Sequence, residues 1–116
     1  MSVYTIYHNP RCSKSRQTLQ LLEQANVEIN VVEYLKNPPS EETIKNLLKM
    51  LDLSPRQAMR TKEVEYKEQN LSDESVSDAR LIRAMHNTPK LIERPIVVVD
   101  DKACIGRPPE NVLALL

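Results

Sequence analysis

The order strand, helix, strand that residues 3–34 predict restricts the fold more than any other part of the chain. Residues 3–7 are mainly β-branched or aromatic and are ended by Asn9-Pro10, so we expect a strand there. Residues 13–25 have the apolar spacing of a helix with one buried face, and residues 27–34 are again rich in β-branched side chains. This order predicts a βαβ unit with parallel strands, and therefore an α/β protein.

The middle of the chain is expected to be helical. Asn37-Pro38-Pro39 ends the βαβ unit, and Ser40 followed by two glutamates is typical of a helix N-terminus. The apolar positions of this helix repeat at i, i+3, i+4 and i+7, at Ile44, Leu47, Leu48 and Leu51. Ser54-Pro55 predicts a further short helix that runs towards Arg60, with Ser54 as its N-cap.

Two more segments precede the return of the chain to the sheet. Residues 61–70 are strongly charged, which indicates a solvated helix or a mobile loop. Residues 72–87 predict an amphipathic helix whose buried face carries Val76, Ala79, Ile82 and Met85. His86 lies near the end of this helix, where we expect a favourable cation at the C-terminus and not a ligand.

The last part of the chain predicts a ββα unit. Ile96–Val99 is an apolar strand, Asp100-Asp101 forms a turn, and residues 103–105 return as an antiparallel strand. Gly106-Arg107-Pro108-Pro109 then opens a final helix with apolar residues at Val112, Leu113 and Leu116. The whole pattern predicts a single domain over residues 1–116, with a four-stranded mixed sheet and a helical insertion.

Composition excludes several classes of function. The chain has 16 basic and 16 acidic residues, so we expect neither a nucleic acid nor a membrane surface as partner. Its longest apolar run, Ile96–Val99, is too short to span a bilayer, and the N-terminus does not resemble a signal peptide, so we expect a cytoplasmic protein. The two cysteines do not form a disulfide framework, and the lone glycine, Gly106, excludes a glycine-rich phosphate loop.

Cys12 occupies the position at which a reactive thiolate would be expected. It follows the first predicted strand and begins the first predicted helix, where the macrodipole and free backbone N–H groups favour an anion. Its neighbours His8, Ser15 and Arg16 are polar or cationic. Cys104 lies in a short apolar run and is expected to be a structural residue.

Other residues extend this pattern. His8-x-x-x-Cys12-x-x-Ser15-Arg16 is followed by Arg60, by Arg94-Pro95-Ile96 and by Gly106-Arg107-Pro108. With the order βαβ, helices, ββα, this set resembles the thioredoxin/glutaredoxin architecture and, within it, the ArsC family of glutaredoxin-linked arsenate reductases, essentially from end to end.

The resemblance implies a reaction. Cys12 would attack arsenate with loss of water, glutathione would attack the cysteine-bound arsenic(V) ester, and glutaredoxin would take up the mixed disulfide as arsenite is released. Glutathione is then a co-substrate, and neither a tightly bound cofactor nor a metal is expected.

The resemblance also implies roles for individual residues. Arg60, Arg94 and Arg107 would hold the oxyanion, and Arg16 is a further candidate on the first helix. His8 would help to lower the pKa of Cys12, Ser15 would donate a hydrogen bond to the thiolate, and Pro95 would be a cis proline beside the cysteine.

Two other interpretations remain open. A regulatory or binding protein similar to Spx would share the architecture without catalysis, although the usual Cys-x-x-Cys switch is absent because residue 15 is serine. The second interpretation is a thiol oxidoreductase that acts on another substrate. It stays open because Ser13-Lys14 stands where arsenate reductases of resistance plasmids have Gly-Thr, a difference close to the reactive cysteine.

Overall fold

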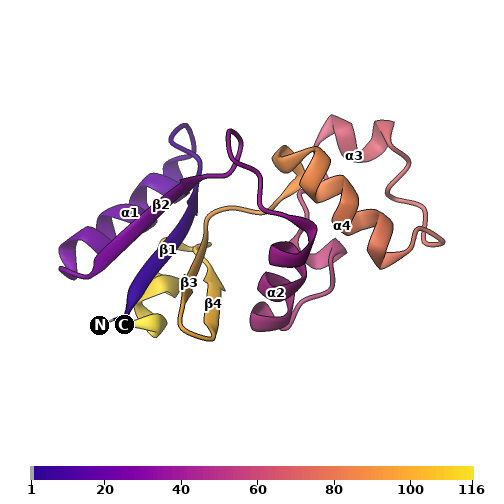
Figure 1. The fold of residues 1–116 in the computed structure, drawn as a ribbon. Coiled ribbons are helices and arrows are strands. Elements are labelled where there is room, and N and C mark those ends of the chain that lie inside the picture. Colours follow the sequence, from indigo (N-terminus) through magenta and orange to yellow (C-terminus); the bar gives the residue numbers. More distant parts are fainter. Residues whose placement is uncertain (1) are drawn as a thin grey trace. The chain divides into compact units, whose positions relative to one another are not determined.

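The computed structural model describes residues 2–116 and contains two compact units. The first unit comprises the chain up to residue 37 together with residues 94–116, and the second comprises residues 38–93. Strands occur in the first unit, whereas the second is the predicted helical insertion (Figure 1). That residues 1–116 form a single domain stays a prediction.

The first unit is built on the four-stranded mixed sheet that the sequence predicts. Its elements are β1 (Val3–His8), α1 (Ser13–Gln24), β2 (Glu28–Glu33), β3 (Ile96–Val99), β4 (Lys102–Ile105) and the 3-10 helix η3 (Pro109–Leu115). The strand order is β2-β1-β3-β4. β1 and β2 are parallel, with His8 opposite Glu33, whereas β3 is antiparallel to both of its neighbours.

The core of the first unit is aliphatic. Ile6, Leu22, Val97 and Val112 are fully buried and come from β1, α1, β3 and η3 respectively. The predicted apolar face of the last helix is partly wrong, because Leu113 and Leu116 are half exposed. A 3-10 helix has three residues per turn, so Pro109, Val112 and Leu115 share one face instead.

Gly106 packs α1 against the loop that precedes β3. A Cβ at Gly106 would lie 2.5 Å from Thr18 Oγ1 and 2.9 Å from Cγ of Pro95, both of which are closer than real Cβ contacts. Thr18 is fully buried, and its hydroxyl donates to the carbonyl of Lys14 at 2.8 Å. The Arg94-Pro95 peptide bond is cis, as predicted, and the Gly106 N–H donates to the Pro95 carbonyl at 2.9 Å.

We therefore expect Gly106→Ala to lower the free energy of unfolding by about 1–3 kcal/mol, the usual cost of overpacking a core. Urea denaturation of both proteins measures this difference. Two of the three close contacts are to Thr18, so the same substitution should cost less in a Thr18→Ala background. Equal costs in the two backgrounds would show that the contact with Thr18 is not the reason for glycine.

The second unit contains the helices α2 (Glu41–Leu51), η1 (Arg56–Ala58), α3 (Val64–Glu68), α4 (Asp78–Asn87) and η2 (Pro89–Leu91). Ser40 is the N-cap of α2, as predicted, and accepts a hydrogen bond from the Thr43 N–H at 3.1 Å. Ile44, Leu47 and Leu48 are buried. The next predicted helix is only the short η1, and Ser54 accepts from the Gln57 N–H at 3.3 Å.

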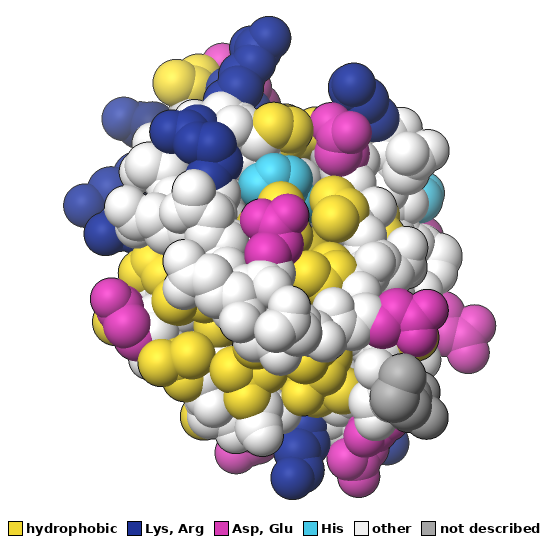
Figure 2. All heavy atoms as spheres, turned by 90° about the vertical axis from the view of Figure 1, so that its left-hand side faces the viewer, with side chains coloured by type: hydrophobic (Ala, Val, Ile, Leu, Met, Phe, Trp, Pro, Cys, Tyr) yellow, Lys and Arg dark blue, Asp and Glu magenta, His cyan; other side chains and the backbone are white. Residues whose placement is uncertain are grey.

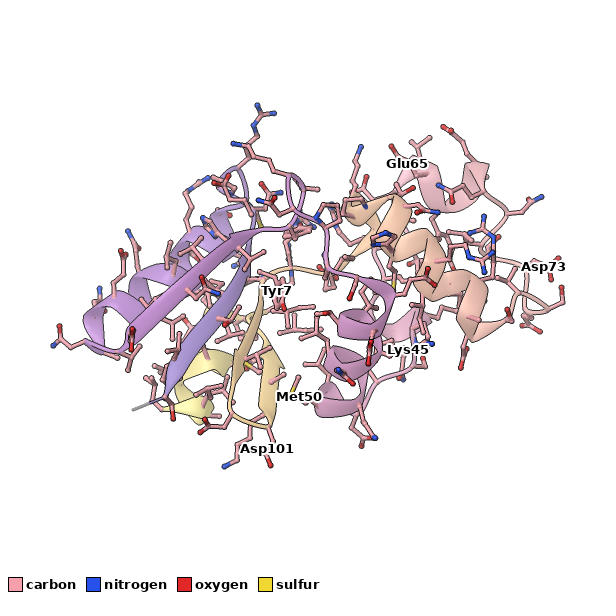
Figure 3. The ribbon with its side chains drawn as sticks, in the orientation of Figure 1. Tyr7, Lys45, Met50, Glu65, Asp73 and Asp101 are labelled. Carbon is pink, nitrogen blue, oxygen red and sulfur yellow. The ribbon has the colours of Figure 1, made fainter. Side chains whose placement is uncertain are left out.

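The helix predicted over residues 72–87 begins only at Asp78. Asp73 (labelled in Figure 3) accepts hydrogen bonds from the N–H and the hydroxyl of Ser75, an Asx turn that replaces the first predicted turn of helix. Ser77 is then the N-cap of α4. The buried face is centred on Leu81, Ile82, Ala84 and Met85, whereas Ala79 is exposed.

The charged segment 61–70 contains the helix α3, which is the first of its two predicted forms, and most of its side chains are exposed. Tyr66 anchors it, because this residue is buried and its hydroxyl accepts a hydrogen bond from Arg56. His86 has a contact outside its own helix, since its Nδ1 lies 2.8 Å from the carbonyl oxygen of Pro39. Across residues 2–116, no helix is both long and apolar enough to cross a membrane.

Candidate functional site

Cys12 lies where the chain leaves β1 and enters α1. Its backbone is extended, with φ −94° and ψ 122°, and it is the N-cap residue of α1. Its N–H donates to the Asn9 carbonyl at 3.0 Å, which closes a tight turn at the carboxyl end of β1. The side chain is largely buried. The turn therefore places the sulfur at the positive end of the helix, as the sequence predicts.

The surroundings of Cys12 favour its thiolate. Burial by itself raises the pKa of Cys12, but the backbone N–H of Ser15, the charge of Arg94, the backbone N–H of Lys14 and the charge of Arg107 together bring the pKa below its ordinary value. Neither N–H forms a full N-cap hydrogen bond with the sulfur in the described chain, so their effect is that of nearby dipoles.

Arg94 and Arg107 are linked to each other beside this thiol. Arg107 Nη2 lies 3.8 Å from Cys12 Sγ, and Arg107 Nε donates to the Arg94 carbonyl at 2.8 Å. Two guanidinium charges thus act on one sulfur. A guanidinium offers several N–H donors in one plane and never loses its charge, which suits it to bind a tetrahedral oxyanion.

His8 and Ser15 form a hydrogen-bonded pair behind the thiol. Both are buried, and His8 Nδ1 lies 2.6 Å from Ser15 Oγ, which also accepts from the Asn9 N–H at 3.0 Å. The Ser15 hydroxyl is therefore engaged with His8, and the backbone N–H of Ser15 lowers the pKa of Cys12. A hydrogen bond from the Ser15 hydroxyl to the thiolate stays a prediction.

The pKa of His8 is set mainly by its burial, and its predicted help in lowering the pKa of Cys12 stays a prediction. Burial lowers the pKa of His8, Glu33 opposes this shift and Arg16 reinforces it, so the imidazole is neutral near pH 7. The hydrogen bond between His8 Nδ1 and Ser15 Oγ fixes the orientation of both side chains.

The other two predicted arginines have partners of their own. Arg16 Nη1 donates to the Pro10 carbonyl at 2.9 Å and so braces the turn that carries Cys12. Arg60 belongs to the second unit and pairs with Glu63, with Nη1 2.5 Å from Oε1. Its approach to Cys12 stays a prediction.

Cys104 has the environment of a structural residue. It lies on β4 opposite Val97 and packs against the core of the first unit. Burial raises the pKa of the Cys104 thiol to about 11. Both cysteines are free thiols.

The opposite shifts of the two cysteines predict different alkylation profiles. A thiol reacts with iodoacetamide as its thiolate, so the rate rises with pH through the pKa. The Cys104→Ser variant should give a midpoint below that of free cysteine, whereas the Cys12→Ser variant should give one near 11. A midpoint for Cys12 at or above that of free cysteine would contradict the assignment.

A hollow adjoins the turn before Cys12, and we call it the strand-end pocket. It has a volume of about 250 Å³ and is lined by His8, Asn9, Pro10, Arg11, Glu33, Leu35 and Lys36. Of these residues, only His8 is a candidate site residue from the sequence. The parallel pairing of β1 with β2 places Glu33 opposite His8, but this register is not readable from the two strands separately.

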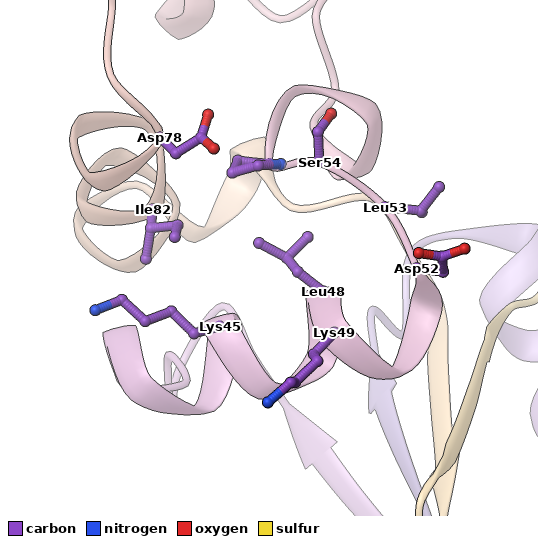
Figure 4. Close-up of a pocket in the computed structure, with 9 residues that line it drawn as sticks. Lys45, Leu48, Lys49, Asp52, Leu53, Ser54, Asp78 and Ile82 are labelled. Atoms are coloured by element: carbon purple, nitrogen blue, oxygen red, sulfur yellow. The ribbon is translucent and has the colours of Figure 1, made fainter.

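The second unit has a larger and more open hollow of about 560 Å³ between α2 and α4 (Figure 4). Its lining residues are Lys45, Leu48, Lys49, Asp52, Leu53, Ser54, Pro55, Asp78 and Ile82. Neither a thiol nor an imidazole is among these described residues. Within residues 2–116, no group of three or more His, Cys, Asp or Glu side chains could hold a metal ion.

The fold and the site define a thioredoxin-like protein with a single thiol at the start of its first helix, beside two arginines. The chain belongs to the ArsC family, whose model matches residues 7–115.

Three relatives illustrate the similarity. The chain is 57% identical over 112 residues to the uncharacterized protein YfgD of Escherichia coli (strain K12), which covers 96% of this chain and 94% of that one. It is 47% identical to the arsenate reductase of Haemophilus influenzae, with 96% and 97% covered. The structure of the arsenate reductase from Vibrio cholerae superimposes with a TM-score of 0.96 at 52% identity, covering 98% of each chain.

Proposed function

We propose that this protein is an arsenate reductase that uses Cys12 as nucleophile and glutathione with glutaredoxin as reductant. The observation that carries the proposal is the Cys12 thiol, with its lowered pKa, 3.8 Å from Arg107 and within the field of Arg94. Relatives named arsenate reductase at 46–47% identity over 96% of the chain support the substrate.

In the first step the Cys12 thiolate attacks arsenic(V). A sulfur–arsenic bond forms, one arsenic–oxygen bond breaks, and the departing oxygen takes up protons and leaves as water. An anionic nucleophile and an anionic substrate repel each other, so the guanidiniums of Arg94 and Arg107 are needed to offset the charge of both. Arg60 is the candidate for a third contact to the oxyanion.

In the second step the thiolate of glutathione attacks the sulfur of Cys12. The sulfur–sulfur bond forms as the electron pair of the sulfur–arsenic bond moves to arsenic, which is thereby reduced to arsenic(III) and leaves as arsenite. Glutaredoxin then attacks the glutathione sulfur and restores the Cys12 thiolate. Two thiols supply the two electrons, and both partners must be kept reduced, which favours a cytoplasmic location.

Phosphate has the same shape and charge as arsenate and would occupy the same arginines. Discrimination therefore resides in the reaction, because arsenic(V) accepts two electrons from thiols under biological conditions and phosphorus(V) does not. Phosphate should act as a competitive inhibitor that is never reduced.

The test is arsenate-dependent oxidation of NADPH in a mixture of the protein, glutathione, glutaredoxin and glutathione reductase. We expect oxidation that requires every component, with the Cys104→Ser variant close to wild type. Replacement of this system by thioredoxin and its reductase tests the choice of reductant. The absence of arsenate-dependent oxidation with either system would refute the proposed function and favour a binding or regulatory protein.

A further inference from the structure

We propose that the strand-end pocket binds glutathione, so that the second thiol of the reaction is held beside Cys12 before it attacks. The inference rests on the proposed function, which consumes a small thiol, and extends it by naming a subsite. The pocket is separate from the arginine side of the thiol, since neither Arg94 nor Arg107 is among the described residues that line it.

The location of the pocket suits a second substrate. His8 and Glu33 are the last residues of β1 and β2, so the pocket lies at the carboxyl ends of two parallel strands, where ligands bind in open α/β sheets. Arg11 lines the pocket and directly precedes Cys12, so their Cα atoms are about 3.8 Å apart. A ligand in the pocket therefore contacts the turn that carries the nucleophile.

The charges of the pocket are the complement of those of glutathione. At neutral pH the γ-glutamyl tripeptide carries two carboxylates and one ammonium group, whereas the pocket offers the two cations Arg11 and Lys36 and the carboxylate of Glu33. Lys36 Nζ lies 3.6 Å from Glu33 Oε1, with the two side chains 77% and 40% exposed. Such an exposed pair is weak, so both groups are available to exchange partners with a ligand.

The size and the apolar part of the pocket fit the same ligand. A volume of about 250 Å³ lies just below the roughly 300–1,000 Å³ of sites for drug-sized molecules. Leu35 is 44% exposed, an apolar surface that the methylene groups of a peptide would cover. Three extended residues span about 10 Å, so a tripeptide in the pocket is long enough to reach the turn that carries Cys12. Figure 2 shows basic side chains gathered near a histidine on one face of the molecule.

The first experiment measures binding without turnover. S-methylglutathione keeps all the charges of glutathione but cannot react, and its binding to the protein is followed by NMR titration. We expect saturable binding that Lys36→Glu weakens about three- to tenfold, because one favourable contact is replaced by a repulsive one. Lys102→Glu, the same change on β4, should leave binding unchanged. If S-methylglutathione fails to bind, or binds equally to Lys36→Glu and wild type, the inference is overturned.

A second pair of variants tests the opposite charge. Glu33→Gln removes the partner of the ammonium group and should weaken binding about two- to fivefold, whereas Glu28→Gln at the other end of β2 should not. Equal affinities for Glu33→Gln and Glu28→Gln would contradict the proposed orientation of the ligand.

Steady-state kinetics separates this inference from the proposed function. Lys36→Glu should raise the KM for glutathione and leave the KM for arsenate unchanged. Binding of S-methylglutathione that depends on Lys36, in a protein that does not reduce arsenate, would refute the proposed function and retain the pocket. Arsenate reduction with a KM for glutathione that Lys36→Glu does not alter would refute the pocket and retain the function.

Discussion

Cys12→Ser should reduce arsenate-dependent turnover by about a thousandfold or more, the scale of loss when a nucleophile is removed. A serine hydroxyl stays protonated at neutral pH and cannot pass electrons to arsenic, whereas the thiol it replaces has a lowered pKa. The measurement is the coupled assay, with circular dichroism to show that the fold is kept.

Cys104→Ser is the matched control, because it also replaces a sulfur by an oxygen, but at a thiol whose pKa is raised. It should keep most of the activity. If Cys104→Ser is as inactive as Cys12→Ser, the working cycle contains a disulfide between the two cysteines, and glutathione is not the first resolving thiol.

Arg94→Lys and Arg107→Lys should each lower kcat/KM about ten- to a hundredfold. Lysine keeps the charge but loses the planar pair of donors, and one charge-assisted hydrogen bond corresponds to about 1.5–3 kcal/mol. Because both guanidiniums also act on the thiol, each variant reports on substrate capture and on the state of Cys12 together.

The alkylation profile separates these two effects. A lysine in place of either arginine keeps a positive charge near the sulfur, so the alkylation midpoint should move little while kcat/KM falls. Arg83→Lys, at an exposed position of α4, is the control for the exchange itself. Near-wild-type kcat/KM in both active-site variants would argue against an oxyanion site built on Arg94 and Arg107.

The sequence predicts most of the sheet and the position of Cys12 because their signals are local. β-branched runs define the strands, and the Asn9-Pro10 turn defines the start of α1. The position of the last helix was predicted correctly, but its buried face was not. Val112, Leu113 and Leu116 satisfy an α-helical spacing, whereas a 3-10 helix buries every third residue.

Other features depend on partners that sequence spacing does not reveal. The start of α4 was placed too early because the Asp73 side chain holds Ser75 in a turn. The contact of the Ser15 hydroxyl with His8 was not predicted, because it joins the end of a strand to a helix. The charge of His8 depends on burial by the folded chain, which a motif of residue types does not specify.

The buried contact between His8 and Ser15 also limits which redox chemistry this chain can acquire by mutation. A cysteine at position 15 would complete the Cys-x-x-Cys pattern, yet it would put a larger atom and a weaker hydrogen-bonding group where His8 Nδ1 lies 2.6 Å from an oxygen. The imidazole would lose its strong partner inside the protein. A single exchange from a one-thiol to a two-thiol site therefore carries a folding penalty, which a second change at position 8 could relieve.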